Sequence, residues 1–436
     1  MKIKPARRIR GRVRLPGDKS ISHRAAIIAS LATGTSRISN FSPSEDCAAT
    51  LSCLEKLGVS IIRSGHNLQV SCEQGLSAPR ETLDCGNSGS TIRMLAGVLA
   101  GQDFSSTLTG DGSLLSRPMS RIIEPLEMMG AEVKSQDGKP PLTVSGANPL
   151  KPIRYELPVA SAQVKSCVLL AGLYSEGQTQ VIESLGATRD HTERMLEWFG
   201  VPLERSTIEK NGSTTISITG SPVLAGRDIA IPGDISSAAF LIAAAALLPD
   251  SALEVEDIGI NPTRTAFLSL LRSLGLAVEI NQKRDECNEA IGHVRVKGNL
   301  PDNQRNDTSN QVRGRVIAQL IDELPLLAVV GTQLQQGIEI RDAGELRHKE
   351  SDRISSTVKN LRAMGAEVEE FADGLAVAGP TSLRGARIDS YGDHRIAMAF
   401  AVAALLAHGD SEVVGTDCVG VSFPEFFNVL ESVAQR

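Results

Sequence analysis

One short phrase recurs along the chain and constrains its fold more than any other feature. An apolar run ends in leucine, two further residues, a bulky apolar residue and usually glycine, followed by a β-prone tail. The copies are Leu54–Gly58, Leu126–Gly130, Leu196–Gly200, Leu271–Gly275, Leu361–Gly365 and, without the glycine, Leu430–Val433. The copies are about 70 residues apart, except for one interval near 90. Such a fixed period indicates one supersecondary unit used repeatedly.

Length and composition limit the possible classes of protein. At 436 residues the chain is long enough for two or three domains. Aromatic residues make up only 3% and the net charge is −6, so neither a base-stacking surface nor a polyanion partner is expected. Seven cysteines without a CxxC pair favour a reducing compartment, and no apolar run approaches a membrane span. We therefore expect a cytoplasmic protein that binds neither nucleic acid nor membrane.

Each repeat shows the same order of patterns. A Gly/Ser/Asp-rich opening leads into an apolar helix, then an alternating strand, a second helix that ends at the Leu–Gly phrase, and two further strands. The predicted opening helices are Pro16–Ala32, Gly86–Leu99, Ser161–Leu173, Gly233–Leu248, Asp322–Val330 and Gly392–Ala407. The Asp373-Gly374 pair predicts a hairpin. The order β-α-β-α-β-β therefore occurs six times.

A second repetition divides the chain into halves. Leu15-Pro16-Gly17-Asp18 is echoed by Ile231-Pro232-Gly233-Asp234, which predicts two α/β domains of three units each, joined at these Pro-Gly-Asp crossings. The polar stretches Lys283–Ile291 and Asn299–Gly314 are predicted to be surface insertions, and they account for the one long repeat.

Cations stand near the predicted helix starts, where the partial positive charge of the helix disfavours them. They are Lys19 and Arg24 beside Ser20, Arg93, Arg117, Arg189, Lys349 and Arg353 around Glu350, and Arg395. Such cations repel one another unless an anion lies among them, and each charge-assisted contact contributes roughly 1.5–3 kcal/mol. A single arginine of this kind is more often a solvated surface residue. Five or six at equivalent repeat positions instead predict one or two small ligands with several negative charges.

Other kinds of site find no support. The chain has no G-x-x-x-x-G-K-[ST] motif, and Gly110-Asp111-Gly112 is too weak for a dinucleotide fingerprint. The histidines show no metal-ligand spacing, and no nucleophilic triad can be inferred. Two carboxylates stand among the cations: Asp322 is either a helix cap or a functional group, and Glu350 is either part of an ion-pair network or a proton donor.

Several motifs together closely resemble the 5-enolpyruvylshikimate-3-phosphate (EPSP) synthase family over essentially the whole chain. They are Leu15–Arg24, Gly86–Arg93, Arg117–Met119, Ser161–Ser166, Ile321–Pro325, Lys349–Arg353 and Asp393–Arg395. Three details, Ser161-Ala162-Gln163, Asn261-Pro262-Thr263-Arg264 and Arg117-Pro118-Met119, resemble a divergent branch that contains glyphosate-tolerant enzymes.

The resemblance implies a particular α/β fold. Two similar domains of three β-α-β-α-β-β units each form an inside-out α/β barrel, the enolpyruvyl transferase fold, and the helix N-termini face an interdomain cleft that contains the active site. On this basis residues 18–233 form one domain, and residues 1–17 with 234–436 form the other.

The resemblance also implies transfer of the enolpyruvyl group of phosphoenolpyruvate to the 5-hydroxyl of shikimate 3-phosphate, with release of phosphate and without metal or cofactor. Lys19, Ser20, Arg24, Ser161, Ala162, Gln163, Arg189, Asp322 and Lys349 would bind shikimate 3-phosphate. Lys19, Gly89, Arg117, Gln163, Glu350, Arg353 and Arg395 would bind phosphoenolpyruvate. Asp322 and Glu350 would act as base and acid, with Lys19 as a third catalytic group. Because one chain supplies every group, we expect a monomer.

Two departures and two rivals qualify the resemblance. Many members have a lysine just before the C-terminal Phe-Pro, where this chain has Val421-Ser422. Tolerant members carry alanine at Gly89, so we expect sensitivity to glyphosate. The related transferase that acts on UDP-N-acetylglucosamine typically has a cysteine in the stretch matching Gly110–Pro118, and this chain has none there. A non-catalytic anion-binding module could lose Asp322 and Glu350, and both are present.

Overall fold

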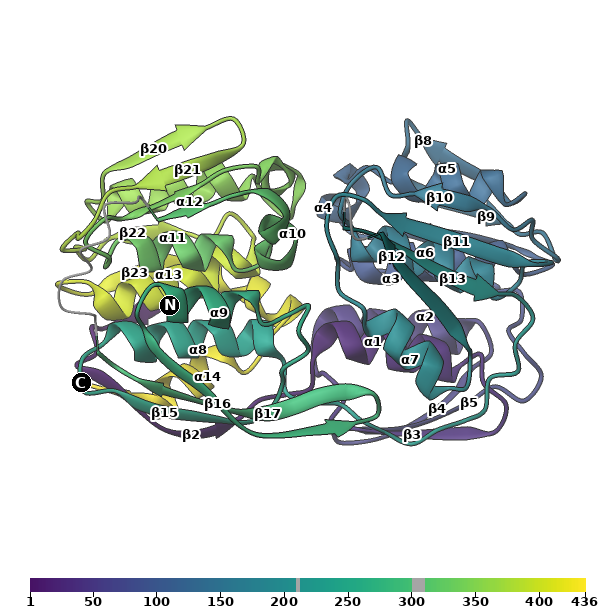
Figure 1. Ribbon diagram of the computed structural model, residues 1–436, viewed down its shortest axis with the longest axis horizontal. Coiled ribbons are helices and arrows are strands. Elements are labelled where there is room, and N and C mark those ends of the chain that lie inside the picture. Colours follow the sequence, from purple (N-terminus) through teal and green to yellow (C-terminus); the bar gives the residue numbers. More distant parts are fainter. Residues whose placement is uncertain (209–211, 300–309) are drawn as a thin grey trace. The chain divides into compact units, whose positions relative to one another are not determined.

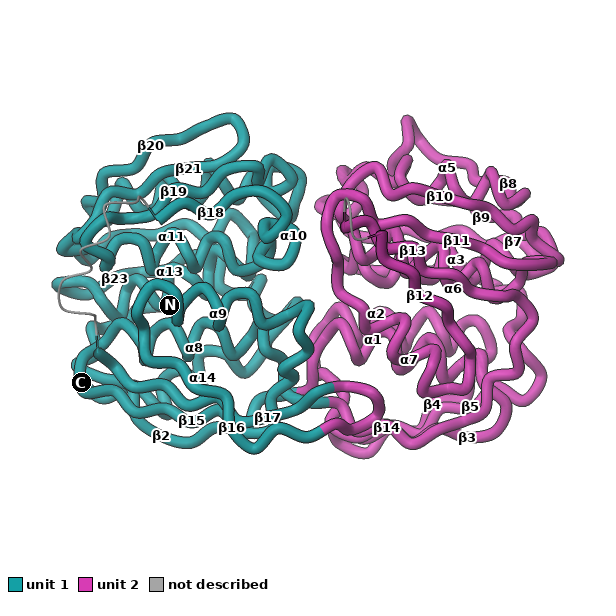
Figure 2. The backbone as a smooth tube through the Cα atoms, in the orientation of Figure 1, with its two compact units in different colours: residues 1–16, 232–284, 290–436 teal, residues 17–231, 285–289 magenta. Residues whose placement is uncertain are grey.

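The computed structural model describes residues 1–208, 212–299 and 310–436, which form two compact units (Figure 2). Unit 1 contains Met1–Pro16, Pro232–Arg284 and Ala290–Arg436, and unit 2 contains Gly17–Ile231 and Asp285–Glu289. The chain passes between the units at the two Pro-Gly-Asp sequences. It does so again around 285–289, a segment that the sequence analysis had placed in the C-terminal domain.

Unit 2 contains three repeats. The first has α1 (Lys19–Ala29), β3 (Thr35–Ser39), α2 (Glu45–Lys56), β4 (Ser60–Ser64) and β5 (Asn67–Ser71). The second has β6 (Leu83–Asp84), α3 (Gly89–Ala100), β7 (Ser105–Thr109), α4 (Gly112–Ser116), α5 (Ser120–Met128), β8 (Glu132–Gln136) and β9 (Lys139–Ser145). The third has β10 (Arg154–Glu156), α6 (Ala162–Gly172), β11 (Gln178–Glu183), α7 (His191–Trp198), β12 (Leu203–Ile208) and β13 (Ser213–Thr219), and β14 (Ile229–Ala230) follows.

Unit 1 begins with β1 (Lys2–Ile3) and β2 (Arg8–Arg14) and resumes after the second crossing. Its fourth repeat has α8 (Ile235–Leu247), β15 (Ala252–Gly259), α9 (Ala266–Ser273), β16 (Ala277–Glu286) and β17 (Glu289–Lys297). The fifth has β18 (Gln311–Val312), α10 (Ile317–Leu320), α11 (Leu324–Gly331), β19 (Ile338–Ile340), α12 (Arg353–Ala363), β20 (Val368–Phe371) and β21 (Gly374–Val377). The sixth has β22 (Arg387–Asp389), α13 (His394–Leu406), β23 (Ser411–Val414), α14 (Phe426–Val433) and β24 (Ala434–Gln435).

The described strands form six sheets, three in each unit, and the same pairing recurs in them. In unit 2 the orders are β14-β3-β5-β4, β6-β7-β9-β8 and β10-β11-β13-β12, and in unit 1 they are β16-β17-β15-β2-β24, β18-β19-β21-β20 and β1-β23-β22. Each sheet contains one parallel pair, such as β6 with β7 or β22 with β23. A parallel pair needs a crossover connection. In four sheets the stretch that contains the apolar helix supplies it, whereas β3 with β14 and β2 with β15 join strands that lie far apart in the sequence.

The apolar helices lie inside each unit and the sheets lie outside (Figure 1). Every residue of α8 and of α11 is buried, and α13 is buried from His394 to Leu405. A helix that is apolar all round must be covered on all sides, which three surrounding sheets achieve. This arrangement confirms the inside-out α/β class, with separate sheets in place of one closed barrel.

The recurring Leu–Gly phrase ends the second helix of the repeats, as predicted. Its leucines, for example Leu54 and Leu271, are fully buried. The glycines adopt left-handed φ values, from 83° at Gly275 to 103° at Gly130. Only glycine takes this conformation without strain, and it turns the chain from the helix into the next strand. The hairpin predicted at Asp373-Gly374 is also confirmed, because Phe371 pairs with Gly374.

One local prediction was wrong. The helix predicted from Asp322 begins at Leu324, and Asp322 lies in the preceding turn. The stretch Lys283–Ile291, predicted to be a surface insertion, forms the end of the β16–β17 hairpin, where Cys287 and Asn288 both have positive φ values and only Glu289 and Ile291 are buried. Most of the insertion predicted at Asn299–Gly314 lies outside the described residues, which resume with β18. No helix among the described residues is long and apolar enough to cross a membrane.

Candidate active site

The predicted site residues fall into two groups, one in each unit. Unit 2 holds Lys19, Ser20, Arg24, Gly89, Arg117, Ser161, Ala162, Gln163 and Arg189, and unit 1 holds Asp322, Lys349, Glu350, Arg353 and Arg395. Each group lies mainly where helices begin.

The first turn of α1 combines a cap with a cation. The Asp18 carboxylate accepts a hydrogen bond of 2.9 Å from the Ile21 amide and so caps the helix. Lys19 follows as the first helical residue, and its Nζ lies 2.8 Å from Asp46 Oδ2 at the start of α2. This ion pair offsets the unfavourable placement of a cation at a helix N-terminus. Lys19 and Ser20 are both partly exposed.

Arg24 lies more than one turn into α1 and not at its start, and its side chain is buried. Its guanidinium donates to Thr192 Oγ1 at 2.7 Å, to Ser166 Oγ at 2.8 Å and to the Ser20 carbonyl at 2.8 Å. Arg24 therefore ties α1 to α6 and α7 and fixes the Ser20 backbone.

Gly89 and Gln163 are joined through Arg93, which lies on α3. Arg93 donates to Gln163 Oε1 at 2.7 Å and to the Gly89 carbonyl at 3.2 Å, and Gln163 Nε2 donates to Ser90 Oγ at 2.9 Å. A Cβ atom on Gly89 would lie 2.5 Å from Arg93 NH1 and 3.2 Å from Arg117 NH1. The absent side chain of Gly89 therefore leaves room for these two guanidinium groups.

Arg117 does not begin a helix. It follows α4 as the C-cap residue, where the negative end of the helix favours a cation. Its side chain is buried, and NH2 donates to Asn87 Oδ1 at 2.8 Å and to Ser113 Oγ at 3.1 Å. Arg117 NH1 and Arg93 NH1 thus lie on the same side of Gly89.

The other residues of this group lie at the N-terminal ends of α6 and α7. Ser161 caps α6, and its Oγ accepts from the Val164 amide at 3.4 Å. Ala162 is the first helical residue, and Arg189 precedes Asp190, the N-cap residue of α7. All three site residues are partly exposed.

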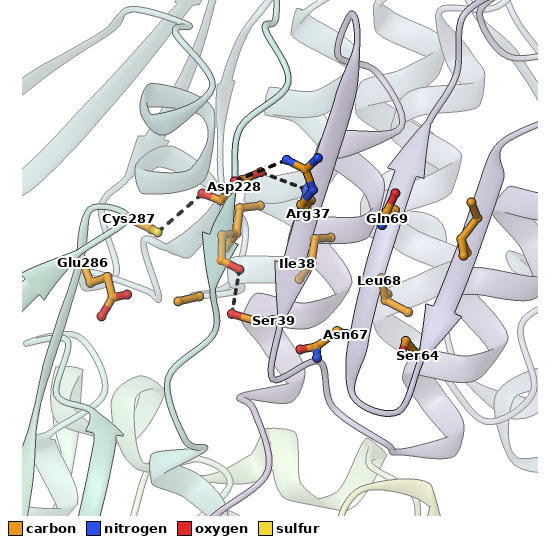
Figure 3. Close-up of a pocket in the computed structure, with 13 residues that line it drawn as sticks. Arg37, Ile38, Ser39, Ser64, Asn67, Leu68, Gln69, Asp228, Glu286 and Cys287 are labelled. Carbon is orange, nitrogen blue, oxygen red and sulfur yellow. Dashed lines mark hydrogen bonds and ion pairs between the residues drawn. The ribbon is translucent and has the colours of Figure 1, made fainter.

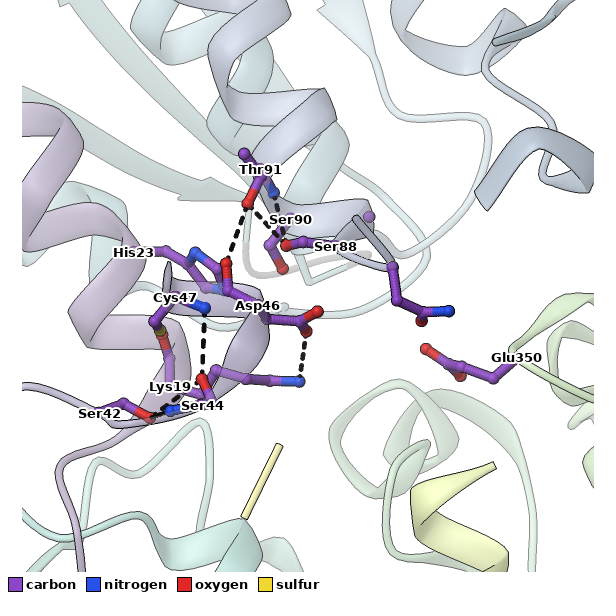
Figure 4. Close-up of polar contacts among 12 residues, drawn as sticks. Lys19, His23, Ser42, Ser44, Asp46, Cys47, Ser88, Ser90, Thr91 and Glu350 are labelled. Atoms are coloured by element: carbon purple, nitrogen blue, oxygen red, sulfur yellow. Dashed lines mark hydrogen bonds and ion pairs between the residues drawn. The ribbon is translucent and has the colours of Figure 1, made fainter. Parts of the chain in front are cut away.

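A chain of buried hydrogen bonds that the sequence did not reveal connects α1, α2 and α3, and Figure 4 shows its end at Thr91 and Ser88. His23 Nδ1 lies 2.7 Å from Thr50 Oγ1, Thr50 lies 2.6 Å from Thr91 Oγ1, and Thr91 donates to Ser88 Oγ at 2.7 Å. Burial, with Lys19 and Arg24 nearby, lowers the pKa of His23 well below its ordinary value. The neutral imidazole therefore belongs to the framework that holds the N-terminal end of α3.

The group in unit 1 centres on Arg353, the first residue of α12. Its guanidinium contacts three carboxylates: Asp393 at 2.8 Å, Glu350 at 2.6 Å and Asp322 at 3.4 Å. Burial alone would lower the pKa of Arg353, but these carboxylates raise it, so the side chain stays charged. The Arg353 side chain is 2% exposed and that of Asp393 is fully buried, whereas Asp322 and Glu350 are 17% and 16% exposed. The cluster is therefore open to solvent only at its two candidate proton-transfer groups.

Arg395 lies in the first turn of α13, which Asp393 caps by accepting from the Arg395 amide at 2.8 Å. Its NH1 donates to Ser236 Oγ at 2.7 Å and lies 3.7 Å from Glu323 Oε1. The guanidinium is buried, and its Nε has no hydrogen-bond partner among the described residues. Lys349 lies between the short helix Gly344–His348 and Glu350, partly exposed.

Two negative observations delimit the site. The described residues contain no cluster of three or more His, Cys, Asp or Glu side chains that could hold a metal ion. A pocket of about 510 Å³ in unit 2 lies against β3, β4 and β5 and is lined by residues such as Arg37, Asn67 and Cys287 (Figure 3). None of the predicted site residues lines it, so it is separate from the candidate site.

The fold and the site define a class of protein. Three β-α-β-α-β-β repeats in each unit, with cations and carboxylates near helix N-termini, are the features of an enolpyruvyl transferase.

Comparison with known proteins identifies the family within that class. The family model for EPSP synthase (3-phosphoshikimate 1-carboxyvinyltransferase) matches residues 3–430. Proteins named 3-phosphoshikimate 1-carboxyvinyltransferase from Solibacter usitatus and Koribacter versatilis are each 48% identical over 100% of this chain and 99% of their own. A solved EPSP synthase from Acinetobacter baumannii is 37% identical, with a TM-score of 0.83 over 99% of this chain and 98% of its own. The chain belongs to the EPSP synthase family.

Proposed function

We propose that the protein catalyses the reaction for which its relatives are named. The enolpyruvyl group of phosphoenolpyruvate is transferred to the 5-hydroxyl of shikimate 3-phosphate, and phosphate is released. This places the protein in the shikimate pathway, which leads to the aromatic amino acids. One observation carries the proposal most directly: Asp322 and Glu350 contact one buried guanidinium while both remain accessible.

Each of the two anionic substrates would be bound by residues from both groups. Shikimate 3-phosphate would be bound by Lys19, Ser20, Arg24, Ser161, Ala162, Gln163, Arg189, Asp322 and Lys349. Phosphoenolpyruvate would be bound by Lys19, Gly89, Arg117, Gln163, Glu350, Arg353 and Arg395. Both substrates carry a phosphate and a carboxylate, and guanidinium groups bind such oxygens in a bidentate manner. The proposal requires the two groups to act on one pair of substrates in a cleft between the domains.

The first half of the reaction is an addition. Asp322 takes the proton of the 5-hydroxyl as its oxygen bonds to C2 of phosphoenolpyruvate, and protonated Glu350 donates a proton to the methylene carbon. The product is a tetrahedral ketal that still carries the phosphate. In the second half Asp322 returns its proton to the leaving phosphate, and Glu350 takes a proton from the new methyl group. The double bond reforms, and both carboxyl groups regain their starting states.

The contacts of Arg353 explain how Glu350 could become a proton donor. Its 2.6 Å contact with Arg353 favours the ionised carboxylate. An anionic substrate bound to Arg353 and Arg395 would compete for the guanidinium and bring negative charge close to Glu350. Both effects favour the protonated form. Lys19 would stabilise negative charge that develops during the addition, and positioning with fixed positive charge supplies the remaining catalysis.

The proposal is tested by phosphate release from phosphoenolpyruvate, measured with and without shikimate 3-phosphate. We expect release that depends strictly on added shikimate 3-phosphate. Phosphate release that depends on UDP-N-acetylglucosamine in place of shikimate 3-phosphate would indicate the related transferase activity. Binding of both substrates without phosphate release would indicate a non-catalytic module. Either of these results would refute the proposed function.

Three further features belong to the same proposal. The seven cysteines are all free thiols, which supports a reducing, cytoplasmic compartment. All proposed groups lie on one chain, which supports a monomer. We also propose that the enzyme is sensitive to glyphosate, because Gly89 leaves the space that a longer mimic of phosphoenolpyruvate would need.

A further inference from the structure

A second cluster of charged side chains is sealed inside unit 2. Lys165 on α6 lies 3.1 Å from Glu183, the last residue of β11, and 2.7 Å from Glu193 in the first turn of α7. The three side chains are 1%, 4% and 2% exposed. Burying charged groups is costly, and apolar residues of similar volume are often at least as stabilising. Stability alone therefore does not account for the cluster.

The cluster holds all three polar groups of one loop residue, Thr188. Glu183 Oε1 accepts from the Thr188 amide at 2.9 Å and from its hydroxyl at 2.5 Å. Lys165 Nζ donates to the Thr188 carbonyl at 3.5 Å. Thr188 is itself buried, and residues 184–190 around it form neither helix nor strand. The backbone of this loop is thus fixed at Thr188 by the ion cluster.

The residue that follows Thr188 is Arg189, a proposed ligand of shikimate 3-phosphate. Lys165 lies on the same helix as Gln163, a second proposed ligand, and only two positions after it. The cluster therefore links the loop 184–190, which contains Arg189, to α6, which contains Gln163. Its ion pairs and hydrogen bonds fix the position of the loop relative to the helix. Errors of about 0.5 Å in such positions are enough to weaken a site.

We infer that Lys165, with Glu183 and Glu193, is a positioning residue that sets Arg189 for binding of shikimate 3-phosphate. This inference rests on the proposed function. Lys165 acts through Thr188 and Arg189 and does not itself contact substrate.

The inference is tested by a double-mutant cycle on the whole enzyme, with the dissociation constant of shikimate 3-phosphate measured by calorimetry without phosphoenolpyruvate. Lys165→Met/Glu193→Gln removes one charge of each sign, so the buried net charge is unchanged and the variant should fold. We expect the dissociation constant to rise about tenfold in this variant and about 10–100-fold in Arg189→Ala. A variant that combines all three substitutions should bind shikimate 3-phosphate no more weakly than Arg189→Ala alone.

Two further measurements separate positioning from general loss of structure. Thr188→Val, which removes only the hydroxyl bond to Glu183, should weaken binding of shikimate 3-phosphate by about threefold. The KM for phosphoenolpyruvate should change less than twofold in both cluster variants. Exposed Lys134→Met serves as the control and should change neither constant.

The outcomes are distinguishable. Effects that multiply in the combined variant would overturn the inference, because Lys165 would then act independently of Arg189. An Arg189→Ala variant with unchanged binding would overturn both the inference and the role of Arg189, while the proposed function would stand. Failure of the wild-type enzyme to bind shikimate 3-phosphate would remove the proposed function itself.

Discussion

Each unit buries one cation among carboxylates, and the two clusters differ in their access to water. In unit 2 the Lys165 cluster is sealed on every member, with no side chain more than 4% exposed. In unit 1 Arg353 and Asp393 are equally sealed, but Asp322 and Glu350 reach solvent. The same electrostatic device can therefore serve two purposes. A sealed carboxylate can only hold the chain in place, whereas an accessible one beside a fixed cation can exchange protons with a substrate.

The largest expected effect comes from the accessible carboxylates. Asp322→Ala or Glu350→Ala should lower kcat by about 10²–10⁴-fold, because each removes a proton-transfer group. Binding of shikimate 3-phosphate should be largely kept. Rapid-quench experiments measure kcat, and calorimetry measures binding of shikimate 3-phosphate. Glu370→Ala, which removes the carboxylate paired with Arg347, is the control. Near-normal turnover in both variants would refute these assignments.

The sealed cluster should show its effect in stability. Lys165→Met leaves two buried glutamates without their cation and should cost about 3–5 kcal/mol of the free energy of unfolding. Arg353→Met should cost less, because Asp322 and Glu350 can be hydrated and Asp393 keeps bonds from Ser351 and the Arg395 amide.

Urea unfolding of the two variants measures this difference. The double variant Lys165→Met/Glu193→Gln should recover much of the stability lost in Lys165→Met. Equal losses for Lys165→Met and Arg353→Met would mean that access to water does not distinguish the clusters.

Gly89→Ala tests a place in unit 2 where two guanidinium groups lie close to a glycine. The new Cβ would lie 2.5 Å from Arg93 NH1, so this guanidinium must shift and disturb its bond to Gln163. Overpacking of this kind costs typically 1–3 kcal/mol, which corresponds to about a fivefold or greater rise in the KM for phosphoenolpyruvate. Inhibition by glyphosate should weaken at least as much.

Gly112→Ala is the matched control, because a Cβ there meets no atom within 4 Å. Steady-state kinetics with varied phosphoenolpyruvate and glyphosate measure both effects. Undiminished wild-type activity in millimolar glyphosate would contradict the role given to Gly89.

The smallest expected effect concerns His23. Burial keeps this side chain neutral, whereas the buried Lys165 and Arg353 stay charged. Its pKa in the folded state is well below the ordinary value, so below about pH 6.5 the unfolded chain binds a proton that the folded chain does not. The free energy of unfolding should therefore fall as the pH decreases, by up to about 1.4 kcal/mol per pH unit. This contribution is fully present above about pH 6.5.

Urea unfolding between pH 5 and pH 7.5 tests this prediction. His23→Asn should flatten the pH dependence relative to wild type, and exposed His66→Asn should leave it unchanged. An identical slope in wild type and His23→Asn would show that His23 does not titrate in the way its burial requires.

The repeat could be predicted from the sequence because its signals are local. Apolar helices, the Leu–Gly phrase and the Asp-Gly hairpin each depend on neighbours a few residues away. Asp322 was misplaced because a polar residue before an apolar run resembles a cap, whereas the helix starts two residues later and Asp322 contacts Arg353 instead.

The buried networks could not be predicted, because their partners come from distant parts of the chain. In the sequence, Lys165 is one polar residue in an apolar helix, and no neighbouring residue indicates that Glu183 and Glu193 are its partners. The same is true of the chain from His23 to Ser88, whose members belong to α1, α2 and α3 or the residue that caps it. Only the folded repeats bring these residues together.

The most direct test follows hydrogen at the methylene carbon of phosphoenolpyruvate during turnover in D₂O. If Glu350 protonates this carbon and the resulting methyl group rotates before Glu350 removes a proton from it, the enolpyruvyl product must contain deuterium. We expect deuterium in the product of the wild-type enzyme, detected by mass spectrometry, and its loss together with turnover in Glu350→Gln. Full turnover in D₂O with no deuterium at this carbon would contradict the account.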